Sequence, residues 1–149
     1  MTEAEGSIEW QSTGNDANGS VDGAVDQRVQ VLVADDNKEV LMATGDVIQD
    51  FPGIGAVSLT TSVEEAVRSA ALHRPDVAFI DAFLRGGGAE AAAVRIRAVS
   101  PNTMVVALTS AEDLELVLRL RAAGVAGCYE KETLSAVLPA ILASLRLRR

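Results

Sequence analysis

Short apolar runs alternate along the chain with longer segments in which apolar residues recur every three or four positions. The runs are rich in β-branched residues and lack the polar alternation of half-exposed strands, which predicts strands buried on both faces of a sheet. They lie at 29–34, 57–60, 76–81, 104–109 and 125–129. Helical spacing follows each run, in segments that begin after Asn37 and Ser62 and then at 89–99, 111–122 and 133–147.

Polar and cyclic residues mark where these helices begin and end. Asn37 is a good N-cap for the first helix, and Ser62 with Glu65 three residues later predicts a capping box for the second. Pro139 lies inside the last helical segment, where it removes one backbone donor, so we expect it to kink or delay that helix.

Strands that alternate with helices predict βαβ units, which build a parallel sheet with helices on both faces. The expected fold class is therefore α/β, a doubly wound sheet of five parallel strands. In such folds the functional groups gather at the carboxyl ends of the strands. Any candidate chemistry should be found at that edge.

Length and charge divide the chain into two parts. The 149 residues suffice for one domain, and all 13 basic residues follow residue 27. Residues 1–27 carry six acids and little apolar surface, which predicts a disordered acidic tail before a domain over 28–149. That domain has 15 acids against 13 bases, a balance of −2 that argues against nucleic-acid binding by this chain alone.

Apolar stretches are too short for a membrane span, and the N-terminus is acidic where a secretory signal is basic. We therefore expect a cytoplasmic protein without a membrane partner.

Five polar residues close the predicted strands. Asp35 and Asp36 follow the first, Asp81 ends the third, Thr109 ends the fourth and Lys131 follows the fifth. Three carboxylates at one edge require a cation or a shared proton, and oxygen ligands favour a hard ion such as Mg²⁺. A lysine and a hydroxyl nearby suit the oxygens of a phosphoryl group, and an aspartate beside Mg²⁺ can act as a nucleophile.

These residues and their surroundings resemble the receiver domain of bacterial two-component response regulators. The order of acid pair, acceptor aspartate, Thr or Ser and Lys matches, with 45 residues from Asp36 to Asp81, 28 more to Thr109 and 22 more to Lys131. Local strings match too, including VLVADDN, PDVAFID, VVALTS and AGVAGCYEK. The resemblance covers about residues 29–147.

The resemblance implies a flavodoxin-like fold with strand order 2-1-3-4-5 and a phosphorylation-controlled switch. Asp81 would accept phosphate from a sensor histidine kinase or a phosphotransfer protein. Its Mg²⁺ would be held by Asp35, Asp36, Asp81 and the backbone carbonyl of Phe83. The chain would be a signalling domain and not an enzyme, apart from self-phosphorylation and self-dephosphorylation.

The same resemblance implies that Lys131 and Thr109 bind the phosphoryl group. Thr109 would move toward it and shift the surface formed by the fourth helix, the fifth strand and the last helix. This surface, or the last helix alone, could also form a homodimer.

The chain departs from the family pattern at several positions. Arg85 stands where a proline is usual, and the glycines at 86–88 predict a looser loop beside Asp81. Cys128 replaces the usual aromatic residue of the switch, and Tyr129, one place later, should face the other side of the sheet. Glu132 and Thr133 after the lysine resemble the regulators that carry a helix-turn-helix output. No output domain follows Arg149, so the chain is either free-standing or a fragment of a longer regulator.

Two alternatives remain open. A receiver-like module could signal through its surface without phosphorylation, an alternative that Cys128 and the unusual loop leave open. A haloacid-dehalogenase-type phosphatase also uses Asp, Mg²⁺, Thr and Lys, but it needs an Asp-x-Asp nucleophile on the first strand. Here the pair is adjacent, and Ala82 and Phe83 follow Asp81, so no general acid stands two residues on.

Overall fold

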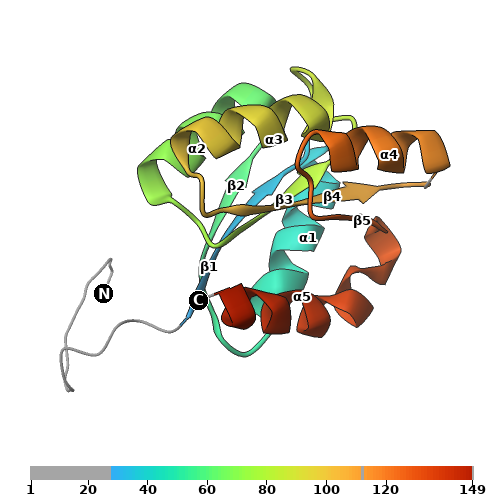
Figure 1. The fold of residues 1–149 in the computed structure, drawn as a ribbon. Coiled ribbons are helices and arrows are strands. Elements are labelled where there is room, and N and C mark those ends of the chain that lie inside the picture. Colours follow the sequence, from blue (N-terminus) through green and yellow to red (C-terminus); the bar gives the residue numbers. More distant parts are fainter. Residues whose placement is uncertain (1–27, 112, 149) are drawn as a thin grey trace.

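The computed structural model describes residues 28–111 and 113–148. They form a single five-stranded sheet of order β2-β1-β3-β4-β5 in which every neighbouring pair is parallel (Figure 1). This confirms the predicted fold class and strand order. The predicted tail over 1–27 lies outside the described residues.

Strands and helices alternate strictly along the described chain (Figure 1). The strands are β1 (Val29–Ala34), β2 (Ile54–Thr60), β3 (Val77–Asp81), β4 (Met104–Thr109) and β5 (Gly127–Glu130). The helices are α1 (Lys38–Gln49), α2 (Val63–His73), α3 (Gly88–Val99), α4 (Leu114–Ala122) and α5 (Leu134–Arg148), with a 3₁₀ turn η1 (Lys131–Thr133) before α5.

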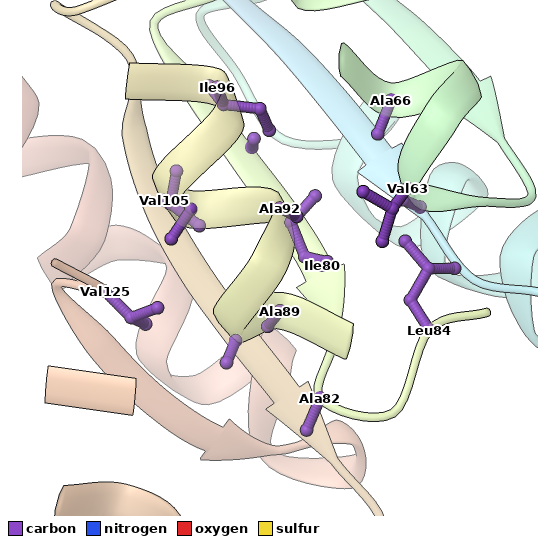
Figure 2. Close-up of a cluster of buried hydrophobic side chains, with 14 of the residues drawn as sticks. Val63, Ala66, Ile80, Ala82, Leu84, Ala89, Ala92, Ile96, Val105 and Val125 are labelled. Carbon is purple, nitrogen blue, oxygen red and sulfur yellow. The ribbon is translucent and has the colours of Figure 1, made fainter. Parts of the chain in front are cut away.

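The sheet separates two hydrophobic cores, because successive side chains of a strand point to opposite faces. In β1, Leu32 and Ala34 pack on the side of α2, α3 and α4, whereas Val31 and Val33 pack on the side of α1 and α5. Figure 2 shows the first of these cores, where small residues of α3 such as Ala92 lie close over the sheet. Burial on both faces explains why the sequences of β1, β3 and β4 are mainly apolar, whereas the edge strands β2 and β5 are only partly buried, contrary to the expectation for all five.

Local signals place the first two helices as expected, with one difference. Asn37 Oδ1 accepts a hydrogen bond from the amide of Val40 at 3.1 Å, and Ser62 Oγ accepts one from Glu65 at 3.1 Å. The capping box is incomplete, however, because Glu65 Oε1 accepts from the amide of Thr61 at 2.8 Å and not from Ser62. The glutamate therefore satisfies a donor one residue earlier than the motif predicts.

Pro139 does not delay the last helix, which begins five residues before it and continues to Arg148. The expected delay was wrong: the helix accommodates Pro139 although the proline removes one backbone hydrogen bond and its ring crowds the carbonyl of Ser135. Leu138, Ile141 and Leu142 beside it are buried against the sheet, and this packing holds the helix together. No helix of the described ranges is both long and apolar enough to cross a membrane.

Candidate functional site

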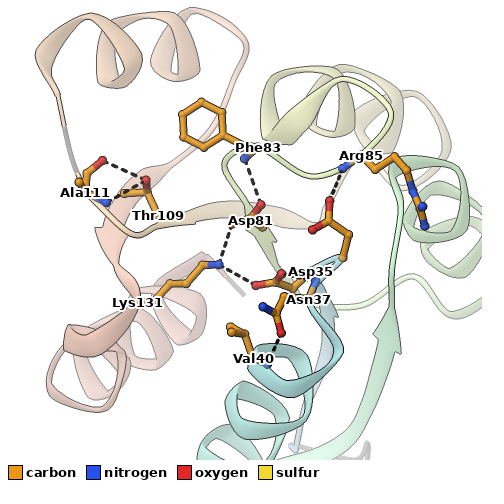
Figure 3. Close-up of polar contacts among 10 residues, drawn as sticks. Asp35, Asn37, Val40, Asp81, Phe83, Arg85, Thr109, Ala111 and Lys131 are labelled. Atoms are coloured by element: carbon orange, nitrogen blue, oxygen red, sulfur yellow. Dashed lines mark hydrogen bonds and ion pairs between the residues drawn. The ribbon is translucent and has the colours of Figure 1, made fainter.

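Polar residues from four separate strand ends meet at the carboxyl edge of the sheet (Figure 3). Asp35 and Asp36 follow β1, Asp81 is the last residue of β3, and Thr109 is the last residue of β4. Lys131 begins η1 directly after β5. Because parallel strands end at one edge, residues up to 96 positions apart in the sequence come into contact there.

Lys131 lies between two of the carboxylates. Its Nζ is 2.7 Å from Asp35 Oδ2 and 2.8 Å from Asp81 Oδ1. The exposed fractions of the three side chains are 22% for Lys131, 7% for Asp35 and 13% for Asp81. One ammonium group is therefore shared by two carboxylates that have little access to water.

The pKa of Lys131 reflects two opposing effects. Burial by itself lowers the pKa, because it disfavours the charged ammonium. The hydrogen bonds to Asp35 and Asp81 and the negative charges of these groups act in the other direction and prevail, so the pKa of Lys131 is raised above its usual value. The lysine is thus a permanent cation at neutral pH.

Asp35, Asp36 and Asp81 together form a group that could hold a metal ion. One carboxylate oxygen of each lies within 4.8 Å of the others. Asp35 is buried, Asp81 is partly buried and Asp36 is exposed, so the group opens toward solvent on the side of Asp36. An all-oxygen set with an open side fits Mg²⁺, which keeps several waters and takes only a few carboxylates.

Main-chain amides fix the orientation of each carboxylate. Each of the three accepts a hydrogen bond from an N–H group of the loop that follows β1 or β3 (Figure 3). The donors are Asn37 to Asp35 Oδ1 at 2.9 Å, Phe83 to Asp81 Oδ2 at 3.2 Å, and Arg85 to Asp36 Oδ2 at 3.0 Å. The hydrogen bond from the amide of Asn37 to Asp35 could have been predicted, because an aspartate often accepts a hydrogen bond from the amide two residues later.

The loop between β3 and α3 follows a hydrogen-bonded path through its three glycines. Gly86, Gly87 and Gly88 all have positive φ, from 74° to 120°. The amide of Gly88 donates to the carbonyl of Leu84 at 2.7 Å, and the Leu84 side chain is buried. The glycines therefore permit a tight backbone path that side chains would strain.

Thr109 is buried, and its hydroxyl is turned toward the chain that follows it. Its Oγ1 donates to the carbonyl oxygen of Ala111 at 3.0 Å (Figure 3). The structure thus brings Thr109 to the same edge as Asp81 but directs its hydroxyl to the next turn.

Cys128 and Tyr129 point to opposite faces of β5, as predicted from the shift of one residue. Cys128 packs against the core beneath α2, α3 and α4, and Tyr129 packs against the core beneath α1 and α5. A Cβ at Gly127 would lie 3.0 Å from the Tyr129 ring, so this ring lies over the glycine. The aromatic ring therefore occupies a different side of the sheet from the one the family pattern implies.

A groove lies beside Lys131, between α1 and the start of α5. Its volume is about 430 Å³. Its lining is mainly apolar and comprises Val40, Ala43, Thr44, Val47, Ser110, Lys131, Glu132, Leu134 and Ser135. The groove adjoins the site because Lys131 belongs to both.

Comparison with known proteins gives one consistent result. The model of the response regulator receiver domain matches residues 31–143. Response regulator GacA of Pseudomonas syringae pv. syringae is 35% identical over 104 residues, which cover 69% of this chain and 48% of that protein. The GacA of Pseudomonas aeruginosa is 32% identical over the same shares. The chain thus spans about half the length of the curated relatives it matches.

Solved structures share the fold at low sequence identity. The signal receiver domain of the putative response regulator NarL from Mycobacterium tuberculosis has a TM-score of 0.74 at 21% identity, covering 80% of this chain and 98% of that one. A CheY-like receiver domain protein from Methanospirillum hungatei has a TM-score of 0.71 at 16% identity, covering 82% and 99%. On the match over 113 positions (31–143) and the curated relatives above 30% identity, this chain belongs to the response regulator receiver domain family.

Proposed function

We propose that the chain is a phosphorylation-controlled signalling switch in which Asp81 accepts a phosphoryl group. The observation that carries this proposal is the position of the Lys131 ammonium, 2.8 Å from Asp81 and within a cluster of three carboxylates. A carboxylate that is oriented by an amide and paired with a lysine is a suitable nucleophile with a cation ready for the incoming charge.

In the transfer step, a carboxylate oxygen of Asp81 attacks the phosphorus atom of a phosphorylated histidine on the partner. The new O–P bond forms as the P–N bond breaks, and the imidazole nitrogen keeps the electron pair. The Lys131 ammonium, which now binds the carboxylate, then binds an oxygen of the transferred group. No proton has to leave Asp81, because the aspartate reacts as its carboxylate.

Mg²⁺ would be held by Asp35, Asp36, Asp81 and the backbone carbonyl of Phe83, and it would supply electrostatic stabilisation of the phosphoryl oxygens. The three carboxylates carry three negative charges, and Lys131 carries one positive charge. The remaining negative charge of the site can be balanced by a divalent cation. The amide of Arg85 donates to Asp36 Oδ2 at 3.0 Å. The other carboxylate oxygen of Asp36 would then bind the ion or a water molecule of the ion.

Thr109 would convert phosphorylation into a change of surface. Its hydroxyl would exchange the carbonyl of Ala111, 3.0 Å away, for an oxygen of the phosphoryl group. This exchange would pull the loop before α4 toward Asp81. Such contacts need to favour one state by only a few kcal/mol to shift the population.

The partner would be a sensor histidine kinase or a phosphotransfer protein that docks beside the site. The groove between α1 and α5 supports this, because it is mainly apolar, has a volume of about 430 Å³ and includes Lys131 in its lining. A helix that carries the phosphorylated histidine could lay its apolar face there. Leu114 and Leu118 of α4 are 73% and 53% exposed and would serve a homodimer or an output contact through α4, β5 and α5.

The test is phosphorylation by a small-molecule donor. The chain is incubated with acetyl phosphate and Mg²⁺, and intact mass is measured for the parent, for Asp81→Ala and for a control, Asp46→Ala, which removes an exposed aspartate of α1. The parent and the control should each gain one phosphoryl group, and Asp81→Ala should gain none. Equal gain by Asp81→Ala would refute the assignment.

A receiver-like module without phosphorylation would give a different result. Such a chain would fail to form a beryllofluoride complex, which occupies the place of the phosphoryl group on the acceptor carboxylate. The phosphatase alternative has lost its support, because the chain belongs to the receiver family.

A further inference from the structure

The backbone of Arg85 connects the candidate metal site to the start of α2. Its amide donates to Asp36 Oδ2 at 3.0 Å, and its carbonyl oxygen accepts from the amide of Val63, the first residue of α2, at 2.9 Å. Figure 3 shows the first of these bonds, with the Arg85 side chain turned away from Lys131. The backbone of one residue is therefore bonded both to a candidate metal ligand and to a helix.

Asp36 depends on this amide more than the other two carboxylates depend on theirs. Asp35 and Asp81 each have two partners, a main-chain amide and the Lys131 ammonium. In the described part of the chain, Asp36 has the Arg85 amide alone, and its side chain is exposed. Without that bond the side chain would rotate in solvent, and an ion that binds it would have to fix it at a cost in conformational entropy.

Packing fixes the carbonyl end of Arg85. Val63 and Leu84 are both buried in the core beneath α2, α3 and α4 (Figure 2). Gly86 lies against Val63, because a Cβ at this glycine would be 3.0 Å from the Val63 Cβ. The residues on both sides of Arg85 therefore hold its carbonyl beside α2, so the loop cannot move without displacing the first turn of that helix.

We propose that Arg85 is a positioning residue of the divalent-cation site and that it couples occupancy of this site to the first turn of α2. This inference rests on the proposed function, because it takes Asp36 as a ligand of Mg²⁺. An ion on the other carboxylate oxygen of Asp36 fixes the acceptor of the Arg85 amide. The loop then opens less often, and so does the bond from Val63 to the Arg85 carbonyl. By linkage, an ordered first turn of α2 strengthens binding of the ion by the same factor.

The test separates the amide of Arg85 from its side chain. Arg85→Pro removes the N–H that donates to Asp36 but keeps the carbonyl, whereas Arg85→Ala keeps both groups, and the two variants lose the same charge. Mg²⁺ binding is measured by titration followed in ¹H–¹⁵N spectra, and thermal melts in chelator establish that each variant is folded. We expect Mg²⁺ affinity to be about fivefold weaker in Arg85→Pro than in Arg85→Ala, the size expected for one exposed hydrogen bond.

A double variant distinguishes positioning from a general disturbance of the loop. If Arg85 acts through Asp36, Arg85→Pro should not weaken Mg²⁺ binding further in an Asp36→Ala background. A proline that distorts the loop would weaken binding in both backgrounds, and this result would overturn the positioning role.

Amide hydrogen exchange measures the coupling to α2. The reference is the amide of Asp76, which donates to the carbonyl of Gln30 at the amino ends of β1 and β3. In Arg85→Ala, Mg²⁺ should slow exchange at Val63 at least about threefold more than at Asp76, because the local opening is suppressed. In Arg85→Pro, Mg²⁺ should slow both amides equally. An equal effect on the two amides in Arg85→Ala would overturn the coupling.

Asp36→Ala replaces Arg85→Pro if the proline variant does not fold, since it removes the acceptor of the same bond. In chelator, Asp36→Ala should speed exchange at Val63 relative to Asp76, and an unchanged ratio would overturn the proposal. Absence of Mg²⁺ binding to the parent would refute the metal site and the proposed function as well. Mg²⁺ binding to the parent, with equal affinity in Arg85→Pro and Arg85→Ala, would refute this inference alone.

Discussion

Lys131 offers the sharpest test of how the site is held together. Changing Lys131 to methionine keeps the length of the side chain but removes the ammonium that contacts Asp35 at 2.7 Å and Asp81 at 2.8 Å. In a metal-free solution, two poorly exposed carboxylates would then face each other without a cation. Their mutual repulsion should then lower the stability of the folded state.

The size of the effect follows from the geometry. Two unit charges 2.7 Å apart attract each other by about 6 kcal/mol at an effective dielectric of about 20, before the cost of desolvation. Removing one partner of a fully buried pair costs about 3–5 kcal/mol. Because the Lys131 side chain is 22% exposed, water can reach the remaining charges, and we expect a loss of about 2–3 kcal/mol for K131M.

Urea unfolding in the presence of a chelator measures this loss. The matched control is Lys38→Met, which removes the other lysine of the chain from an exposed position at the start of α1. The control should change the free energy of unfolding by less than about 0.5 kcal/mol. Adding Mg²⁺ should stabilise K131M more than the parent, since the ion replaces the missing cation. Equal stability of the two variants in chelator would refute the reasoning.

Three other predictions concern pH, lifetime and the glycine loop. The pKa of Lys131 is raised in the folded state, so its contribution is complete below the ordinary lysine value of about 10.4 and disappears as pH rises through the higher folded value. The difference in free energy of unfolding between the parent and K131M, measured by urea titration, should thus stay constant from about pH 7 to about pH 9. It should shrink only above about pH 10.4. Phosphorylated Asp81 should be long-lived, because Phe83 cannot orient an attacking water; intact mass in Mg²⁺ at neutral pH should show decay over minutes or longer, and decay within seconds would contradict this. Gly88→Ala should lower the free energy of unfolding by at least about 2 kcal/mol in thermal melts, since its Cβ would lie 2.5 Å from the Ala82 carbonyl. Gly124→Ala meets only a movable arginine side chain and should lower the free energy of unfolding by about 1 kcal/mol.

The fold could be predicted because its signals are local. The apolar strand sequences of β1 and β3 require burial on both faces, and Asn37 and Ser62 mark the starts of helices with their own side chains. The parallel arrangement then brings Asp35, Asp81 and Lys131 to one edge whatever the details of the loops. The sequence alone was therefore sufficient to predict that these residues lie at one edge of the sheet.

Details that depend on contacts between distant segments could not be predicted. The amide of Arg85 donates to Asp36 across 49 residues, and nothing in either local sequence indicates this. Likewise, Gln30 accepts from the amide of Ala56 at 3.0 Å, where β2 carries an irregularity in its register with β1. The path of the glycine loop could not be predicted for the same reason, because it depends on the burial of the Leu84 side chain in the core.

The central claim is that carboxylates from the ends of β1 and β3 form one site for a divalent cation. Calorimetric titration of the whole chain with Mg²⁺ tests it most directly, with Asp36→Asn as the perturbed variant and Asp46→Asn as the control. The account predicts one Mg²⁺ per chain in the parent and the control, and an affinity at least about tenfold weaker, about 1.4 kcal/mol, in Asp36→Asn. The absence of Mg²⁺ binding to the parent, or equal affinity in Asp36→Asn, would contradict it.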